Sequence, residues 1–151
     1  MNNDILRNIG NISRSLDSIS NIEFKDIELE KGQYLYLSRV FENPGITQRQ
    51  LSDLLCVDKT TTNRAISRLI EKKLVVKKSD LNNKKHKLLW VSNKGEELYK
   101  TLERESNYST HVALSGLNQD EIIKMDKLLS KIARNVATDW QKVKKGYKRT
   151  Y

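Results

Sequence analysis

Apolar residues near both ends of the chain recur with the spacing of a helix that packs against another helix. In the N-terminal stretch they step by four and three residues, at Ile5, Ile9, Ile12, Leu16 and Ile19. A longer series lies near the C-terminus, at Ile122, Met125, Leu129, Ile132, Val136, Trp140, Val143 and Tyr147. Each series predicts an amphipathic helix with a heptad-like apolar seam, and the first helix is expected to end at about Ser20.

Three further helices are expected in the first half of the chain. One spans residues 28–41 and ends at Asn43-Pro44-Gly45. Its inward positions are Leu29, Tyr36, Leu37 and Val40. The next begins at Thr47-Gln-Arg-Gln50, which has the form of a capping box, and ends near Cys56. Asp58 can cap the third. Its inward positions are Ala65, Ile66, Leu69 and Ile70.

A small β-hairpin and a long helix follow. Residues 74–76 and 88–91 have strand character, and the polar, basic segment 80–87 between them predicts a charged tip. The long helix opens at Ser92-Asn-Lys-Gly-Glu, runs to about Leu114 and ends at Gly116. Asn118-Gln-Asp-Glu121 is another capping box, which opens the C-terminal helix. The expected fold is mainly α with a small β-wing.

Length and composition limit the class of protein. The chain has 151 residues, which fits one domain, and no apolar run approaches a membrane span. Cys56 is the only cysteine and no export signal is seen, which favours a cytoplasmic location. Two His and one Cys make a zinc site improbable, so we expect no metal and no cofactor. No paired carboxylates, nucleophile with its base, or Gly-rich phosphate loop indicates an enzyme.

The whole chain has a formal net charge of +9, and the positive charge is concentrated in its middle. Residues 1–46 have five basic and seven acidic side chains, a net charge of −2. Residues 47–87 have eleven basic and four acidic side chains, net +7, and residues 88–151 add +4. Such a segment is typical of a nucleic-acid surface, although a charge run alone also fits a solvated basic face.

A short helix, a turn, a helix with a polar outer arc and a basic hairpin together indicate a winged helix-turn-helix. The first turns of such a recognition helix meet base edges in the major groove. Arg suits guanine, Asn suits adenine and the Thr methyl suits thymine, so the helix can read sequence as well as bind phosphate. The residues predicted to contact DNA are Thr47, Gln48, Arg49, Lys59, Thr60, Thr61, Asn63, Arg64, Ser67, Arg68, Lys78, Asn82, Lys84, Lys85 and Lys87.

Several motifs in this region also carry a family resemblance. They are Leu29 and Gln33 in the second helix, Gly45-Ile-Thr-Gln, Leu51-Ser-Asp-Leu-Leu, Val57-Asp-Lys-Thr-Thr and Leu69-Ile-Glu-Lys, with a wing of matching length from Asp80 to Gly95. The pattern resembles the MarR family of bacterial transcription regulators, and the whole chain is similar to its SlyA-like branch. The resemblance implies a homodimer with entwined terminal helices and two winged lobes on a pseudo-palindromic operator.

The same resemblance divides the expected single domain, 1–151, into dimerisation helices at 1–28 and 117–151, a winged helix-turn-helix at 29–95 and a connecting helix at 93–115. It also implies that a small aromatic or phenolic effector can bind between the dimer helices and the DNA-binding lobe. The expected lining is Ile9, Ser13, Tyr34, Leu37, Ser38 and Phe41. The alternative is that these residues close the core between the first two helices.

The chain departs from the family pattern at the wing and after the recognition helix. Asn82 and Asn83 replace an Arg and Asp that usually pair, and the tip has Lys84 and Lys85 instead of Arg. Because Lys lacks the guanidinium fork, wing contacts should be less directional and more salt-dependent. Lys73 replaces a usual Gly, and a left-handed conformation there would cost about 1 to 2 kcal/mol.

Alternatives stay open for several residues. The terminal seams predict a dimer, although they could close an intramolecular hairpin. The seam residues are Ile5, Ile9, Ile12 and Leu16 with Leu129, Ile132, Val136 and Trp140. Cys56 is expected to be a small buried hydrophobe rather than a redox sensor, and His111 an ordinary helix residue rather than a ligand contact. The leading function is a DNA-binding repressor or activator, ahead of a protein-interaction module.

Overall fold

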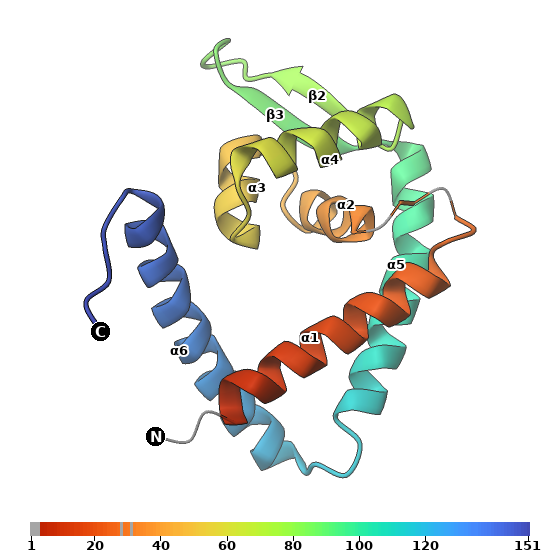
Figure 1. The fold of residues 1–151 in the computed structure, drawn as a ribbon. Helices are drawn as coiled ribbons and strands as arrows, with labels where there is room; N and C mark the ends of the chain where they lie inside the picture. The colour runs from red at the N-terminus through yellow and green to blue at the C-terminus, as the bar shows by residue number, and fades with distance from the viewer. Residues whose placement is uncertain (1–3, 28, 31) are drawn as a thin grey trace. The chain divides into compact units, whose positions relative to one another are not determined.

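The computed structural model describes residues 4–27, 29–30 and 32–151 (Figure 1). Over these residues the chain forms six α-helices and a three-stranded sheet. The helices are α1 Asp4–Glu23, α2 Gln33–Glu42, α3 Gln48–Leu55, α4 Lys59–Glu71, α5 Asn93–Ala113 and α6 Gln119–Lys144. The strands are β1 Ile46–Thr47, β2 Val75–Ser79 and β3 Lys87–Val91. The prediction of a mainly helical fold with a small β-wing is confirmed.

The chain divides into two compact units, Met1–Ser109 and Thr110–Tyr151, and α5 crosses the boundary between them. The first unit contains α1 to α4, the sheet and most of α5, and the second contains all of α6. The division into dimerisation helices, winged lobe and connecting helix stays a prediction. In the ranges described, no helix has both the length and the apolar character needed to cross a membrane.

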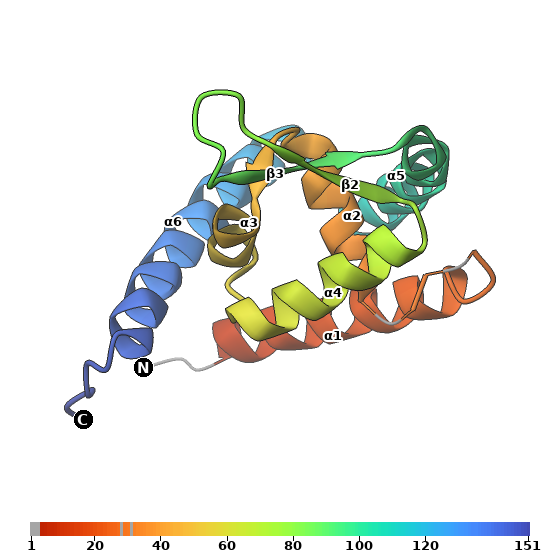
Figure 2. The same cartoon turned by 90° about the horizontal axis from the view of Figure 1, so that it is seen from above.

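The sheet is antiparallel in the order β1-β3-β2, so β3 pairs on both sides. Val75 lies opposite Val91 and Ser79 opposite Lys87 in the hairpin, while Ile46 of β1 pairs with Leu89. Figure 2 shows β2 and β3 side by side, with the loop that joins them projecting from the end of the hairpin. The sheet therefore joins the wing to the start of α3.

The core of the first unit collects apolar side chains from the three central helices and the sheet. Its fully buried members are Leu37, Val40, Leu51, Ile66, Leu69, Leu74 and Leu89. The start of α5 packs at Gly95 against Leu74, the residue before β2, where a Cβ atom would lie 2.3 Å from the Leu74 carbonyl oxygen. Only glycine allows this approach, because a side-chain carbon cannot come so close to backbone oxygen. Burial of these side chains is the main stabilising contribution to the lobe.

The predicted start of the second helix is wrong. α2 begins at Gln33, five residues later than expected, because Gly32 has φ +78, a left-handed conformation that ends any helix arriving from the N-terminal side. Leu29 is buried without belonging to the helix, so its burial produced a misleading periodicity. Glu28, the first residue of the predicted helix, lies outside the described residues.

Other boundaries shift by smaller amounts. α1 runs to Glu23 instead of about Ser20, and α6 ends at Lys144, so Tyr147 lies beyond the helix. The first hairpin strand begins at Val75 rather than at residue 74 and extends to Ser79. The two-residue strand β1 was not predicted, since it has no alternating pattern and forms through its pairing with β3. The capping boxes at Thr47 and Asn118 are both confirmed.

Two residues outside glycine adopt left-handed backbone conformations among those described. Lys73 has φ 59, so it adopts the left-handed conformation for which the sequence analysis expected backbone strain. Cys56 has φ 52 and is exposed, so the prediction of a buried hydrophobe is wrong. The reason is its place as the C-cap of α3: the left-handed turn redirects the chain toward α4 and leaves the thiol at the surface.

Candidate nucleic-acid interface

Local caps fix the starts of both helices of the helix-turn-helix. Thr47 Oγ1 accepts a hydrogen bond from the Gln50 amide at 3.2 Å, and Gln50 Oε1 accepts one from the Thr47 amide at 2.9 Å. At the start of α4, Asp58 accepts hydrogen bonds from the amide and hydroxyl of Thr61 at 2.8 and 2.7 Å. These bonds, chiefly the one from the Thr61 amide, hold the pKa of the Asp58 carboxyl below its usual value.

Buried hydroxyls join α3 to α4. Ser52 Oγ lies 2.9 Å from Thr62 Oγ1, and both residues are buried. Tyr36 of α2 also hydrogen-bonds Thr62, and burial raises the pKa of the Tyr36 hydroxyl. Because each buried hydroxyl has a partner, the contact aligns three helices without leaving an unsatisfied polar group. The angle between α3 and α4 is therefore set from inside the lobe.

The outer face of α4 is polar and exposed, as the sequence predicted. Thr62, Ile66 and Leu69 point into the core. Every member of the predicted DNA-contacting set on this helix is exposed, namely Lys59, Thr60, Thr61, Asn63, Arg64, Ser67 and Arg68. One face of the helix thus packs on the lobe while the other presents donors and cations to solvent.

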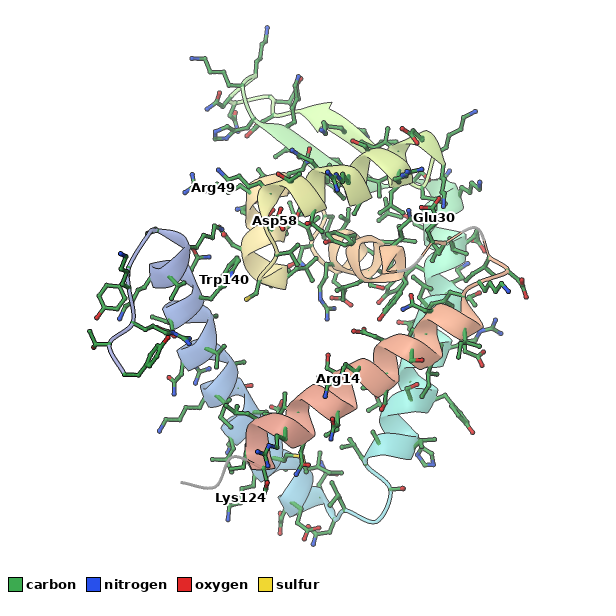
Figure 3. The ribbon with its side chains drawn as sticks, in the orientation of Figure 1. Arg14, Glu30, Arg49, Asp58, Lys124 and Trp140 are labelled. Carbon is green, nitrogen blue, oxygen red and sulfur yellow. The ribbon has the colours of Figure 1, made fainter. Side chains whose placement is uncertain are left out.

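The start of α3 lies against this face. Gln48 Nε2 donates a hydrogen bond to Asn63 Oδ1 of α4, a contact between residues that the sequence pattern did not connect. Figure 3 shows the Arg49 side chain extending outward from α3, and Arg49 is exposed. Thr47 and Gln48 are half-buried. The structure therefore brings the N-terminus of α3 and the middle of α4 to one surface.

The wing tip is shaped by polar side chains that hydrogen-bond its own backbone. Asp80 accepts a bond from the Asn82 amide at 2.9 Å, and Asn83 accepts one from the Lys85 amide at 3.2 Å. The side chains of Asn82, Lys84 and Lys85 are exposed. Asn82 and Asn83 thus belong to a turn that is held by hydrogen bonds between side chains and backbone amides. Two lysines stand at the end of a defined loop.

Further along the hairpin, the basic side chains have partners within the sheet. Lys87 Nζ donates to Ser79 Oγ at 2.6 Å across the strand pair. The Lys78 ammonium lies 5.9 Å from the centre of the Trp90 ring. A cation near an aromatic face gains a modest attraction and keeps its charge at the surface. Lys78 and Lys87 are therefore oriented on the wing as well as exposed.

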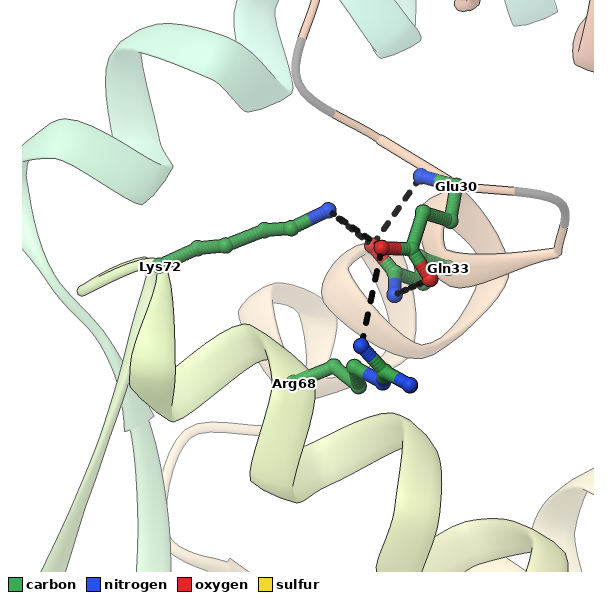
Figure 4. A network of polar contacts seen from close by, with 4 residues as sticks. All are labelled: Glu30, Gln33, Arg68 and Lys72. Atoms are coloured by element: carbon green, nitrogen blue, oxygen red, sulfur yellow. Dashed lines mark hydrogen bonds and ion pairs between the residues drawn. The ribbon is translucent and has the colours of Figure 1, made fainter.

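An acidic residue that the sequence analysis did not single out meets the C-terminal end of α4. Glu30 lies 3.8 Å from the Arg68 guanidinium and 3.7 Å from the Lys72 ammonium (Figure 4). Gln33, which is buried, accepts a hydrogen bond from Lys72 at 2.9 Å. Glu30 and Arg68 are more than half exposed, so their ion pair contributes little to stability. Its consequence is orientation, because it draws Arg68 toward the segment before α2.

The terminal helices expose apolar side chains. On α1, Ile12 is 56% exposed and Ile5 is 54% exposed, and Ile9 and Leu16 are half-buried. On α6, Val136 is 54% exposed, Leu129 is also exposed, and Ile132 and Trp140 are half-buried. None of the described α6 residues is buried. Helix faces of this kind are stable in water only when another surface covers them.

The predicted effector-binding residues have different surroundings. Leu37 is fully buried in the core, and the Phe41 ring is stacked on Tyr99 with centroids 3.8 Å apart. Tyr34 donates a 2.5 Å hydrogen bond to Asp17 of α1, and burial, followed by that bond, raises the pKa of its hydroxyl to about 12. Ile9 and Ser38 are half-buried and Ser13 is exposed. Ile9 and Ser13 lie on α1, whereas the other four residues of the set lie on α2.

Comparisons with known proteins agree with this geometry. Residues 29–87 match the MarR family. The HTH-type transcriptional regulator YybA of Bacillus subtilis is 51% identical over 149 residues, which cover 99% of each chain. A SlyA-like transcription regulator from Listeria monocytogenes has 51% identity, full coverage of both chains and a TM-score of 0.92.

A second crystal structure from Listeria monocytogenes, a MarR family transcriptional regulator complexed with a 26mer DNA, has 51% identity, full coverage of both chains and a TM-score of 0.96. These relatives are regulators, and the prediction that the chain is not an enzyme is confirmed. The chain belongs to the MarR family of transcription regulators, with a winged helix-turn-helix of the SlyA-like kind.

Proposed function

We propose that this chain binds double-stranded DNA sequence-specifically, as a homodimer on a pseudo-palindromic operator. The observation that carries the proposal is the exposed polar face of α4, mounted on a capped and hydrogen-bonded α3 and followed by a basic hairpin. A protein-interaction module would expose an apolar patch at this place instead. The Listeria regulator complexed with a 26mer DNA, similar over its full length, supports the same interpretation.

Within this proposal, α4 enters the major groove and reads bases. Arg64 is an exposed guanidinium able to pair with guanine, and Asn63 presents an amide beside it. Thr60 and Thr61 offer methyl groups in the first turn, where a recognition helix approaches base edges. Ser67 and Arg68 stand one turn further along and are assigned to the DNA backbone.

Phosphate contacts are assigned to the start of α3 and to the wing. Thr47, Gln48 and Arg49 surround a helix N-terminus, where backbone N–H groups and the helix dipole favour an anion. Lys84 and Lys85 at the wing tip reach the DNA backbone or the minor groove. Lys78, Asn82 and Lys87, elsewhere on the hairpin, contact the DNA backbone beside them. Lys59 at the start of α4 completes the set. Contacts to phosphate position the lobe and do not themselves touch base edges.

The proposed dimer uses the apolar faces of α1 and α6. Ile5 and Ile12 on α1 and Leu129 and Val136 on α6 are exposed in the single chain, and a second copy would cover them. A twofold axis would then place two α4 helices about one DNA turn apart, so half-sites are expected about 10 base pairs apart. Sedimentation of the free protein at micromolar concentration tests this part, because a monomer with full DNA affinity would exclude it.

We also propose that a small aromatic or phenolic effector binds between α1 and α2 and weakens operator binding. The supporting observation is Tyr34, half-buried with its ring 5.5 Å from that of Phe24 and its hydroxyl bonded to Asp17. An effector acts only if it binds the DNA-incompetent arrangement better, and a coupling of about 1 to 3 kcal/mol lowers operator affinity about 5- to 150-fold.

Titration of salicylate-like and neutral phenolic compounds against a labelled operator tests the effector. Tyr34→Phe keeps the ring and removes the hydroxyl, so we expect DNA binding to persist while the response to the compound is lost. If no compound changes operator affinity and none binds the free protein by calorimetry, the regulator has no effector of this class.

The central experiment is a gel shift with genomic fragments at two salt concentrations, followed by sequencing of the retained fragments. Release of counterions by bound lysines and arginines makes affinity fall steeply with salt, and a specific regulator retains a small set of fragments that share a pseudo-palindrome. A protein-interaction module would retain none.

A further inference from the structure

Gln48 and Asn63 join two side-chain amides across the helix-turn-helix. Gln48 is the first residue of α3 and Asn63 the fifth of α4. Nε2 of Gln48 donates a hydrogen bond to Oδ1 of Asn63. Asn63 is exposed and Gln48 is half-buried, so the pair lies at the surface proposed to face DNA. Because Asn63 directly precedes Arg64, its side chain can reach the DNA groove that is proposed to receive Arg64.

The backbones that carry these two amides are held in place beneath them. Ser52 Oγ lies 2.9 Å from the carbonyl oxygen of Gln48 and 2.9 Å from Thr62 Oγ1. Thr62 directly precedes Asn63, and its Oγ1 also lies 3.2 Å from the Asp58 carbonyl. The amide pair on this frame is pre-organised, because both side chains extend from backbone positions that these hydrogen bonds fix.

The bond decides which end of the Asn63 amide remains for DNA. An asparagine side chain has an acceptor oxygen and an NH₂ group with two donors. Gln48 occupies the oxygen of Asn63, and no partner for Nδ2 is found in the described part of the chain. Asn63 therefore presents its NH₂ group outward, and the oxygen points at α3.

We propose that Gln48 is a positioning residue that sets the base preference of Asn63. The proposal rests on the proposed function, because it assumes that this face of α4 meets the major groove. An unrestrained asparagine offers a donor and an acceptor and pairs with adenine N6 and N7. With its oxygen held by Gln48, Asn63 selects a base edge rich in acceptors, so guanine or thymine is favoured over cytosine, whose N4 amino group is a donor.

Gln48→Glu should reverse this preference. A carboxylate accepts hydrogen bonds and cannot donate them, so Asn63 must turn its NH₂ group toward position 48 and its oxygen toward the DNA. Cytosine or adenine, which present amino groups in the major groove, should then be favoured at the same operator position. Folding is not at risk, because an acidic residue in the first turn of a helix is favourable.

Selection from a pool of duplexes with a random core of about two helical turns, about 20 base pairs, tests the proposal. The proteins are the full-length wild type, Gln48→Ala, Gln48→Glu and Asn63→Ala, with Arg49→Ala as a matched control at the neighbouring exposed position of α3. Asn63→Ala should relax one position of each half-site about 3- to 10-fold, the range expected for one hydrogen bond. Gln48→Ala should relax that same position, and Gln48→Glu should change the base chosen there. Arg49→Ala should weaken all sequences evenly.

Base preference separates positioning from a merely structural role, which would change affinity without changing the chosen base. The proposal is overturned if the Gln48 variants keep the wild-type base at the position that Asn63→Ala relaxes, or if Asn63→Ala relaxes no position. In both cases a wild-type protein that still selects a motif leaves the proposed function intact. If the wild type enriches no sequence, the proposed function fails and the amide pair has no role in readout.

Discussion

Ser52 of α3 and Thr62 of α4 share a 2.9 Å hydrogen bond between buried hydroxyls, and this contact fixes the two helices of the helix-turn-helix against each other. Tyr36 of α2 shares the same Thr62 hydroxyl. A polar contact of this kind in an otherwise apolar core determines how the helices are aligned, because each donor must meet its partner. The buried hydrogen bond between Ser52 and Thr62 therefore orients the exposed face of α4.

Thr62→Val should destabilise the protein by about 1 to 2 kcal/mol, since valine matches the shape of threonine but ends the hydrogen bonds to Ser52 and Tyr36. Urea unfolding at a fixed protein concentration measures the change. Ser67→Ala, on the exposed side of the same helix, is the matched control and should stay within about 0.5 kcal/mol of the wild type. Equal effects of the two substitutions would show that the buried bond does not stabilise the lobe.

Asp58 should make the lobe less stable in acid. Its pKa is lowered in the folded chain, chiefly by the Thr61 amide. The stabilisation is therefore present above the pKa of the unfolded chain and is lost as the pH falls through the folded value, below about pH 4. Asp58→Asn keeps a capping oxygen without a titrating group. At neutral pH the urea midpoint of Asp58→Asn should lie closer to the wild-type midpoint than the midpoint of Asp58→Ala does. As the pH falls below about 4, the midpoint of Asp58→Asn should fall less than that of the wild type.

Arg64→Ala and Lys84→Ala should weaken DNA binding in different ways. Loss of Arg64 should cost about 1 to 3 kcal/mol at one operator position and relax the preference there. Loss of Lys84 should weaken all sequences evenly and reduce the salt slope by about 1 per lobe. Competition assays with operator and random duplexes at several salt concentrations separate the two. A larger change of sequence preference from Lys84→Ala than from Arg64→Ala would mean that the roles are reversed.

Glu30→Gln should raise DNA affinity about two- to fivefold at low salt, because it removes the carboxylate that pairs with the Arg68 guanidinium and leaves that guanidinium available to a phosphate. The free energy of unfolding should change by no more than about 0.5 kcal/mol, since the pair is exposed. Glu71→Gln removes the same charge from the exposed end of α4 and serves as the control. If both variants bind DNA equally well, the effect is one of net charge and Glu30 does not restrain Arg68.

Sequence reasoning succeeded where the determinants are local. α3 and α4 each follow a side chain that caps them, Thr47 and Asp58, and the inward positions of α4 follow the helical period. α2 failed because Gly32 adopts a left-handed conformation while Leu29 is buried outside any helix, so the apolar period continued where the helix did not. A period reports burial, and burial does not require a helix.

The contacts that shape the candidate site were out of reach of the sequence for a different reason. Gln48 and Asn63 are 15 residues apart, and Arg68 and Glu30 are paired across an even longer separation. Such pairs depend on how helices pack, and no local pattern of residue types encodes that packing. The polar face itself could be predicted, whereas the partners that orient its members could not.

Methylation interference on a retained genomic fragment tests the central claim most directly, because guanine N7 faces the major groove and adenine N3 the minor groove. Two α4 helices in successive major grooves predict two symmetric clusters of interfering guanines, centred about 10 base pairs apart, that weaken when Arg64 is replaced by alanine. A single cluster without symmetry, or interference confined to adenine N3, would contradict DNA reading by a dimer through α4.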